Sequence, residues 1–149
     1  MYDRILLPTD GSTEMHGVIE HSVALAEVHD AHLEAFYVVD TATLSRLPME
    51  ASFETVEELL DEEGEEATGM VESIAADRVP VDRVVVDGSP ASEIVREASD
   101  SNCDVIVMGT HGRGGIDRLL LGSVAERVVR TATVPVLTVR VNGDTAMET

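Results

Sequence analysis

The chain contains no lysine and no tryptophan, and these absences exclude two classes of site. All ten basic residues are arginine, which excludes the P-loop, because that motif needs a lysine just inside its helix. Aromatic residues make up 3% of the chain, too few for the platforms on which single-stranded nucleic acids stack. The G-x-G-x-x-G dinucleotide fingerprint and the G-x-S-x-G nucleophile elbow are missing as well.

Cysteine and long apolar runs are also scarce. Cys103 is the single cysteine, so no disulfide can form within the chain, and one thiol fits a reducing cytoplasm. We expect it to be a partly buried residue before a core strand rather than a reactive thiol. No apolar run approaches the ~20 residues of a membrane-spanning helix. The acidic, strand-like start does not resemble a signal peptide. These features predict a cytoplasmic protein without membrane contact.

Acidic residues outnumber basic ones by 29 to 10, which gives a net charge of −19 over 149 residues. Residues 1–100 hold five arginines and 24 acids, whereas residues 101–149 hold five of each. An anionic ligand would therefore be repelled least by residues 101–149. The acidic charge balance also excludes DNA and RNA as partners, because proteins usually bind them through a basic face. The composition resembles that of halophilic proteins. In 1 M salt the Debye length is only about 3 Å, so the repulsion between their many acidic residues is screened. An acidic mesophilic protein is the alternative.

Apolar periodicity predicts alternating strands and helices in one domain, residues 1–141, with a polar tail at 142–149. The predicted strands are Arg4–Pro8, His32–Val39, Asp82–Val86, Asp104–Met108 and Val136–Val141. The predicted helices begin at a cap on Ser12 or Thr13, at about Phe53, at Ser89-Pro90 and at Gly122-Ser123. Residues 40–52 have no clear period and are expected to form a linker. This alternation is typical of an α/β fold whose parallel sheet is covered by helices on both faces.

Each helix has an apolar stripe that should face the sheet. The first contains Met15, Val18, Ile19, Ser22, Leu25 and Ala26. The long helix, predicted to end at Ala76, contains Val56, Leu59, Leu60, Ala67, Met70, Val71 and Ile74. Its acidic residues, Asp61, Glu62, Glu63, Glu65 and Glu66, should face water. The last helix contains Val124, Val128 and Val129, and ends near Thr131.

A glycine-rich segment, Gly109-x2-Gly112-x9-Gly122-Ser123, lies between the buried fourth strand and the last helix. Glycines let the backbone approach a ligand closely, and the free N–H groups at a helix N-terminus attract anions. The order strand, glycines, serine and helix therefore favours a phosphate site. The alternative is a loop whose glycines only allow turns.

The same spacing resembles the G-x2-G-x9-G-[S/T] signature of the ATP-binding branch of the universal stress protein family. Three other segments resemble that family in the same order: Arg4–Ser12, Val86–Ile94 and Val134–Arg140. The resemblance implies a five-stranded parallel sheet of order 3-2-1-4-5, similar to the adenine nucleotide alpha hydrolases. In such a sheet the ligand crevice lies where the strand order reverses, beyond the first and fourth strands.

The expected nucleotide-binding residues lie around that crevice. They are Pro8, Thr9, Asp10, Val38, Met108, Gly109, His111, Gly112, Arg113, Gly122, Ser123 and Val124. The resemblance implies that Val38 and Met108, with Ile106 beneath, line the adenine pocket. Asp10 would contact ribose or a phosphate-bound metal, or else only form a turn before Gly11. Ser123 would bind phosphate, cap its helix, or do both.

The resemblance implies ATP as the ligand, with Mg²⁺ or Mn²⁺ held through the phosphates, and a regulatory role in the stress response. A slow ATPase or autophosphorylating enzyme that uses Asp10 or His111 is one alternative, and an interaction scaffold without ATP is another. Residues Val134–Val141 form an apolar strand at a predicted sheet edge. Such edges are usually paired or covered, so we expect a homodimer through this strand. Coverage of the edge within one chain is the alternative.

Overall fold

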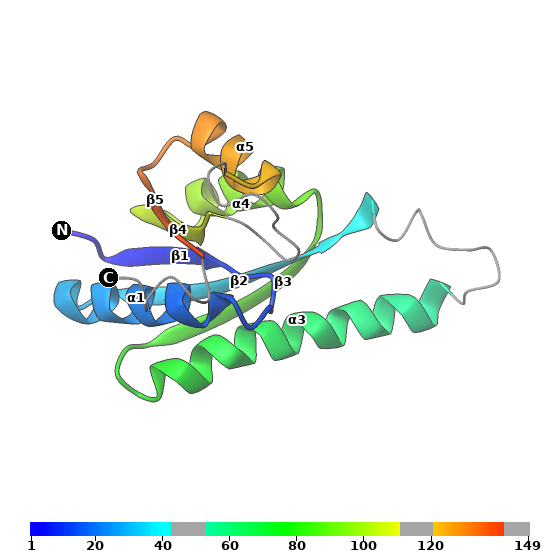
Figure 1. The fold of residues 1–149 in the computed structure, drawn as a ribbon, viewed down its shortest axis with the longest axis horizontal. Coiled ribbons are helices and arrows are strands. Elements are labelled where there is room, and N and C mark those ends of the chain that lie inside the picture. Colours follow the sequence, from blue (N-terminus) through cyan, green and yellow to red (C-terminus); the bar gives the residue numbers. More distant parts are fainter. Residues whose placement is uncertain (43–52, 111–120, 142–149) are drawn as a thin grey trace.

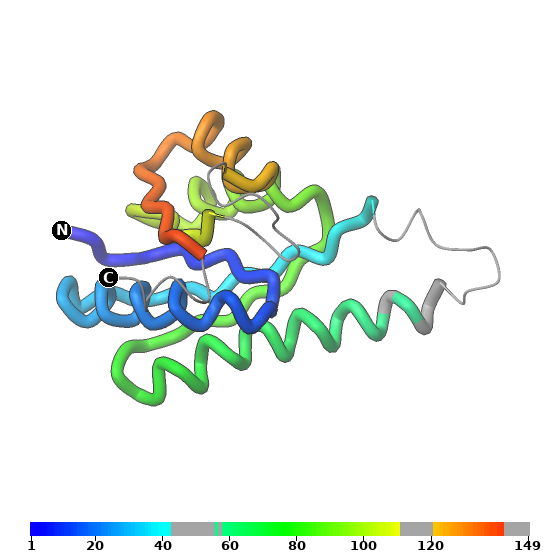
Figure 2. The backbone as a smooth tube through the Cα atoms, in the orientation of Figure 1, coloured from blue at the N-terminus to red at the C-terminus, as the bar shows by residue number. Residues whose placement is uncertain are grey.

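The computed structural model describes residues 1–42, 53–110 and 121–141. It contains a five-stranded sheet of order β3-β2-β1-β4-β5, as expected from the sequence. All neighbouring strands are parallel. The strands are β1 Arg4–Pro8, β2 His32–Asp40, β3 Val81–Gly88, β4 Val105–Gly109 and β5 Val136–Val139. Figure 2 follows the backbone from β1 outward to β3, then across the sheet to β4 and β5.

Helices cover both faces of the sheet (Figure 1). They are α1 Met15–His29, α3 Phe53–Ala75, α4 Pro90–Asp100 and α5 Ser123–Thr131. Helices α1 and α3 lie on one face, whereas α4 and α5 lie on the other. The connection from β1 and the connection from β4 thus leave toward opposite faces, which is the arrangement that opens a ligand crevice between two parallel strands.

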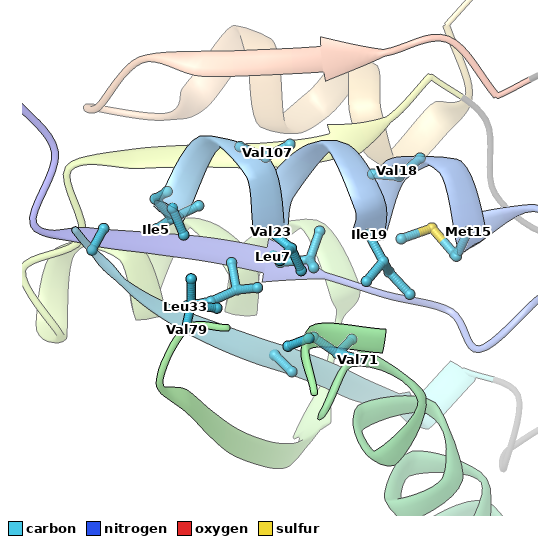
Figure 3. Packing of buried hydrophobic residues seen from close by; sticks show 14 of the residues in the cluster. Ile5, Leu7, Met15, Val18, Ile19, Val23, Leu33, Val71, Val79 and Val107 are labelled. Carbon is cyan, nitrogen blue, oxygen red and sulfur yellow. The ribbon is translucent and has the colours of Figure 1, made fainter. Parts of the chain in front are cut away.

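Alternation along the strands divides the apolar interior into two layers. Ile5 and Leu7 of β1 face α1 and α3, whereas Leu6 between them faces α4 and α5. All three side chains are fully buried. Figure 3 shows the first layer, in which Ile19 and Val23 of α1 gather over the sheet. Both faces of the central strand are therefore dry, as is usual for a parallel sheet.

The predicted elements agree closely with the structure. Strand β1 has the predicted ends, and α3 ends one residue earlier than expected. The acidic residues of α3 named above are all exposed. Cys103 is buried two residues before β4, as expected of a packing residue. Burial raises the pKa of its thiol to about 12, with a further contribution from the nearby Glu34 carboxylate, so the thiol is inert at neutral pH.

Several expectations about helix starts and stripes were wrong. Helix α1 begins at Met15 after Glu14, so neither Ser12 nor Thr13 is its N-cap; their carbonyl oxygens instead accept turn hydrogen bonds. Leu59 is 56% exposed, because α3 begins beyond the carboxyl end of β2 (Figure 1). Val129, expected in the apolar stripe of α5, is 46% exposed, whereas Ala125 of the same helix is buried.

The predicted strand ends also needed small corrections. Asp40, assigned to the linker, is the last residue of β2, and β3 runs from Val81 to Gly88 rather than from Asp82 to Val86. The predicted last strand ends at Val139, two residues early, because Val141 leaves the ladder and bonds to a threonine side chain. The predicted tail, residues 142–149, lies outside the described residues, as does most of the linker.

Candidate functional site

The candidate site lies where β1 and β4 end side by side. These strands pair in parallel, Ile5 with Val105 and Leu6 with Ile106, so their carboxyl ends meet at one edge of the sheet. Pro8 and Gly109, both buried, are their last residues. The chain then turns toward α1 on one face, and α5 begins on the other. The structure therefore brings the expected β1 residues and the start of the glycine-rich segment together.

The turn after β1 is fixed by its own side chains. The Thr9 amide donates to the Phe36 carbonyl at 2.9 Å, which ties the turn to β2. The Gly11 amide donates to Thr9 Oγ1 at 3.1 Å, and the Ser12 amide donates to Asp10 Oδ1 at 2.9 Å. Asp10 thus forms a turn, which was the alternative to a ligand contact in the sequence analysis. Because the Gly11 and Ser12 amides already have acceptors within the turn, these two amides are not available as donors to an anion.

The N-terminus of α5 has the opposite property. Gly122 is the N-cap, with φ −65° and ψ 163°, and as a glycine it has no side chain with which to cap the helix. The Gly122 amide donates to the Thr110 carbonyl at 2.6 Å, and the Glu126 amide closes the first helical turn onto the Gly122 carbonyl. The intervening amides of Ser123, Val124 and Ala125 precede the first intrahelical bond and point out of the helix end. These are the donors that an anion needs.

The cap assignment corrects one expectation from the sequence. Ser123 is the first helical residue rather than the cap, and its side chain is exposed. Its hydroxyl is therefore not needed by the backbone of α5. Glu126 in the first turn carries a charge that would oppose an anion, but it pairs with Arg130 at 3.1 Å on the helix surface. The helix end thus remains favourable to negative charge.

An apolar wall adjoins this helix end on the same face of the sheet. Ile106 is fully buried, and Met108 is 6% exposed above it on β4. Val38 of β2, half-buried, packs in the same layer. All three side chains contribute to ordinary core packing, and the upper two lie at the carboxyl ends of their strands. The wall therefore has the position expected of a surface that receives a planar base.

The remaining expected site residues have a mixed outcome. His111, Gly112 and Arg113 lie outside the described residues. Within residues 1–42, 53–110 and 121–141, no three metal-ligating side chains come together, and no helix is long and apolar enough to cross a membrane.

Thr110, which bonds to both Gly122 and the end of the last strand, was not among the predicted residues. No spacing pattern in the sequence distinguishes it from other loop threonines.

A buried ionic cluster lies at the other end of the strands, and sequence reasoning missed it. Glu34 of β2 has no exposed surface, and its Oε1 accepts a 2.7 Å hydrogen bond from Nη2 of Arg4. Burial raises the pKa of Glu34 to about 7, and the neighbouring Glu97 carboxyl adds to this, whereas Arg4 opposes it. Arg4 and Glu34 lie near the amino ends of β1 and β2, whereas the candidate site lies at the carboxyl ends, so this cluster is separate from the candidate site.

Comparisons with known proteins agree with the fold. The model of the universal stress protein family matches residues 1–140. A universal stress protein of Methanocaldococcus jannaschii is 44% identical over 141 residues, 94% of this chain and 83% of its own length. The solved structure of a second M. jannaschii member, MJ0577, has a TM-score of 0.86 at 30% identity, covering 97% and 99% of the two chains.

A more distant solved structure, of a universal stress protein in complex with cAMP, has a TM-score of 0.69. It covers 95% of this chain and 98% of its own, but the two sequences are only 20% identical. That likeness extends to the fold alone.

Proposed function

This chain belongs to the universal stress protein family, and from that premise we propose that it binds ATP in the crevice at the carboxyl ends of β1 and β4. The triphosphate would lie on the N-terminus of α5, together with Mg²⁺ or Mn²⁺ bound through its oxygens. The role would be regulatory, in that occupancy changes the conformation or partners of the protein. The observation that carries this proposal is the uncapped start of α5.

The donor set at that start fits phosphate. Gly122 is an N-cap without a side chain, so the amides of Ser123 and Val124 have no competing acceptor on the cap residue. Helix dipole and free N–H groups together make such an end an anion site. The surrounding segment, residues 101–149, is also the part of the chain without net negative charge. Gly112, Arg113 and His111 would complete the phosphate site on the basis of the family signature.

The nucleoside end fits the wall and turn beside β1. Val38 and Met108 would contact the adenine ring, Val38 mainly through its backbone, with Pro8, Thr9 and Gly109 shaping the same pocket. The Asp10 carboxylate is held by the Ser12 amide, which would fix it for a ribose hydroxyl or a metal-bound phosphate. The fold accommodates an adenine nucleotide in at least one distant member, the cAMP complex. The preference for ATP over other adenine nucleotides is our inference.

Titration calorimetry in multimolar KCl tests this function. We expect binding of ATP with Mg²⁺ and weaker binding of GTP. Gly122→Val should abolish binding, because a side chain would stand where phosphate meets the backbone. Gly17→Val is the matched control, since a Cβ at Gly17 meets no heavy atom within 4 Å and α1 lies on the other face. The proposal would be refuted if the parent protein did not bind ATP, or if Gly122→Val still bound it.

We also propose that the protein forms a homodimer through β5. This strand is at the edge of the sheet, beside β4. Leu137 is 38% exposed there, and Val136 and Val139 are half-buried. An apolar edge with unpaired backbone groups is normally covered or paired. Antiparallel pairing with a second copy about a two-fold axis would satisfy those groups and bury Leu137.

The acid-rich composition supports one more proposal, that the protein is adapted to concentrated salt. The net charge of −19 is carried entirely by residues 1–100. Many of these acids lie on exposed positions of α3, where their repulsion is strongest in dilute buffer. Salt would therefore stabilise the folded chain.

A further inference from the structure

Thr110 is the first residue after β4, and it hydrogen-bonds both to the start of α5 and to the end of β5. Its carbonyl oxygen accepts the 2.6 Å hydrogen bond from the Gly122 amide, at the start of α5. Its own amide donates to the Val139 carbonyl at 2.9 Å, at the end of β5. Its hydroxyl oxygen, Oγ1, accepts a 3.0 Å hydrogen bond from the Val141 amide. One residue thus bonds to the proposed phosphate end and to the last described residues of the chain.

The two segments lie on different faces of the sheet. Helix α5 packs with α4, through Ala125 and Val128. Val141 is 9% exposed and belongs to the layer beneath α1 and α3. The Val141 amide is partly buried there, and leaving such an N–H without an acceptor costs free energy. The Thr110 hydroxyl supplies that acceptor, so the position of Val141 depends on the side chain of Thr110 and not only on sheet pairing.

We propose that Thr110 is a positioning residue, through which nucleotide binding at the start of α5 and the fixed position of the chain after β5 stabilise each other. This rests on the proposed nucleotide function. The carbonyl that accepts from Gly122, the amide that donates to Val139 and the hydroxyl that accepts from Val141 all belong to Thr110, so a change in its backbone torsions that breaks the bonds to β5 also displaces the carbonyl. A ligand that binds only when Gly122 is held therefore also favours the bonded state of Val141.

The expected size of this effect follows from linkage. A ligand present at 100 times its dissociation constant stabilises the binding-competent state about 100-fold over a state that cannot bind it. If opening at Thr110 abolishes binding, hydrogen exchange of the Val141 amide should slow by up to that factor. The same linkage applies to a variant in which only a fraction of the molecules is in the bonded state. Its dissociation constant for ATP rises by the reciprocal of that fraction.

Hydrogen exchange followed by NMR, with three amides as probes, tests the proposal. The Gly122 amide reports on the phosphate end, and the amides of residue 110 and Val141 report on β5. In the parent protein, saturating ATP with Mg²⁺ should slow exchange at all three by a similar factor, tenfold or more. Thr110→Val keeps the shape of the side chain but removes the acceptor. In that variant ATP should still protect Gly122 but no longer protect Val141, and its dissociation constant should rise threefold or more.

Two further variants serve as controls. Thr110→Ser restores the hydroxyl and should restore both the affinity and the protection of Val141. Thr131→Val removes another threonine hydroxyl, which donates to the Arg127 carbonyl at the far end of α5, and should change neither. If ATP protects Gly122 alone in the parent protein, or if Thr110→Val binds and protects as the parent does, the inference is wrong while the proposed function stands. A parent protein that binds no nucleotide overturns both.

Discussion

Replacement of the buried Glu34 by glutamine should change how stability depends on pH. Three ionisable groups interact with the carboxyl, namely Arg4 from β1, Glu97 from α4 and the Cys103 thiol, and Asp82 from β3 pairs with Arg4. Burial is the largest cause of the raised pKa of Glu34, about 7 against an ordinary 4.5. Between pH 4.5 and pH 7, the folded chain therefore keeps a proton on Glu34 that the unfolded chain has lost.

The sign and size follow from that difference. Because the folded state binds more protons between pH 4.5 and 7, its stabilisation is complete below pH 4.5 and is lost as pH rises through 7. Each pKa unit corresponds to about 1.4 kcal/mol, so the free energy of unfolding should fall by about 2–3 kcal/mol between about pH 5 and pH 8 through Glu34 alone. Glutamine does not titrate, so Glu34→Gln lacks this loss.

Urea denaturation at fixed molar KCl measures the effect. The free energy of unfolding of Glu34→Gln, relative to the parent, should rise by about 2–3 kcal/mol from about pH 5 to pH 8. Glu27→Gln is the matched control. Its hydrogen bonds to Arg78 lower the pKa of Glu27, so its contribution changes only below pH 4.5 and its difference curve should stay flat over the same range. A flat curve for Glu34→Gln as well would refute the reasoning.

Three other outcomes are expected. The melting temperature should rise steeply with KCl concentration, and no change between dilute and multimolar salt would contradict the proposed salt adaptation. Light scattering should show a dimer in molar KCl that becomes monomeric in Leu137→Lys/Val139→Lys; a dimer that survives both changes has its interface elsewhere. Thermal melts should show Gly64→Ala destabilised by about 1–3 kcal/mol, because a Cβ there would lie 2.8 Å from Val85 Cγ1. The control Gly17→Ala, in open space, should gain up to about 1 kcal/mol in stability.

The sequence predicted those features of the fold that depend on local pattern. The apolar run at β1 and the stripe of α3 fixed their boundaries to within a residue, because burial on one or both faces imposes a period that can be read directly. The same pattern did not predict that Leu59 is exposed. A stripe identifies which side of a helix is apolar, but not how far the helix extends beyond the sheet that it covers.

The missed features depend on contacts between distant segments. Glu34 stands in an apolar strand, and its partner Arg4 comes from 30 residues earlier, so periodicity could not predict a buried carboxyl with a raised pKa. Thr110 was missed for the same reason, since its hydroxyl bonds to an amide 31 residues later. The glycine spacing, by contrast, is local and correctly identified the start of α5, although Gly122 rather than Ser123 is its N-cap.

That last difference bears on why this helix, and not another, is suited to an anion. The structure describes the N-caps of three helices, and they differ in what they leave free. Helix α1 follows Glu14, whose carboxylate repels negative charge. Helix α4 begins with Pro90, which has no N–H to donate. Helix α5 follows Gly122, which has neither defect and carries no side-chain oxygen that could accept from the amides that follow. None of the three described N-caps makes a side-chain capping bond, but only at Gly122 is such a bond ruled out by the residue itself, which leaves the N–H groups of the first turn available to a phosphate.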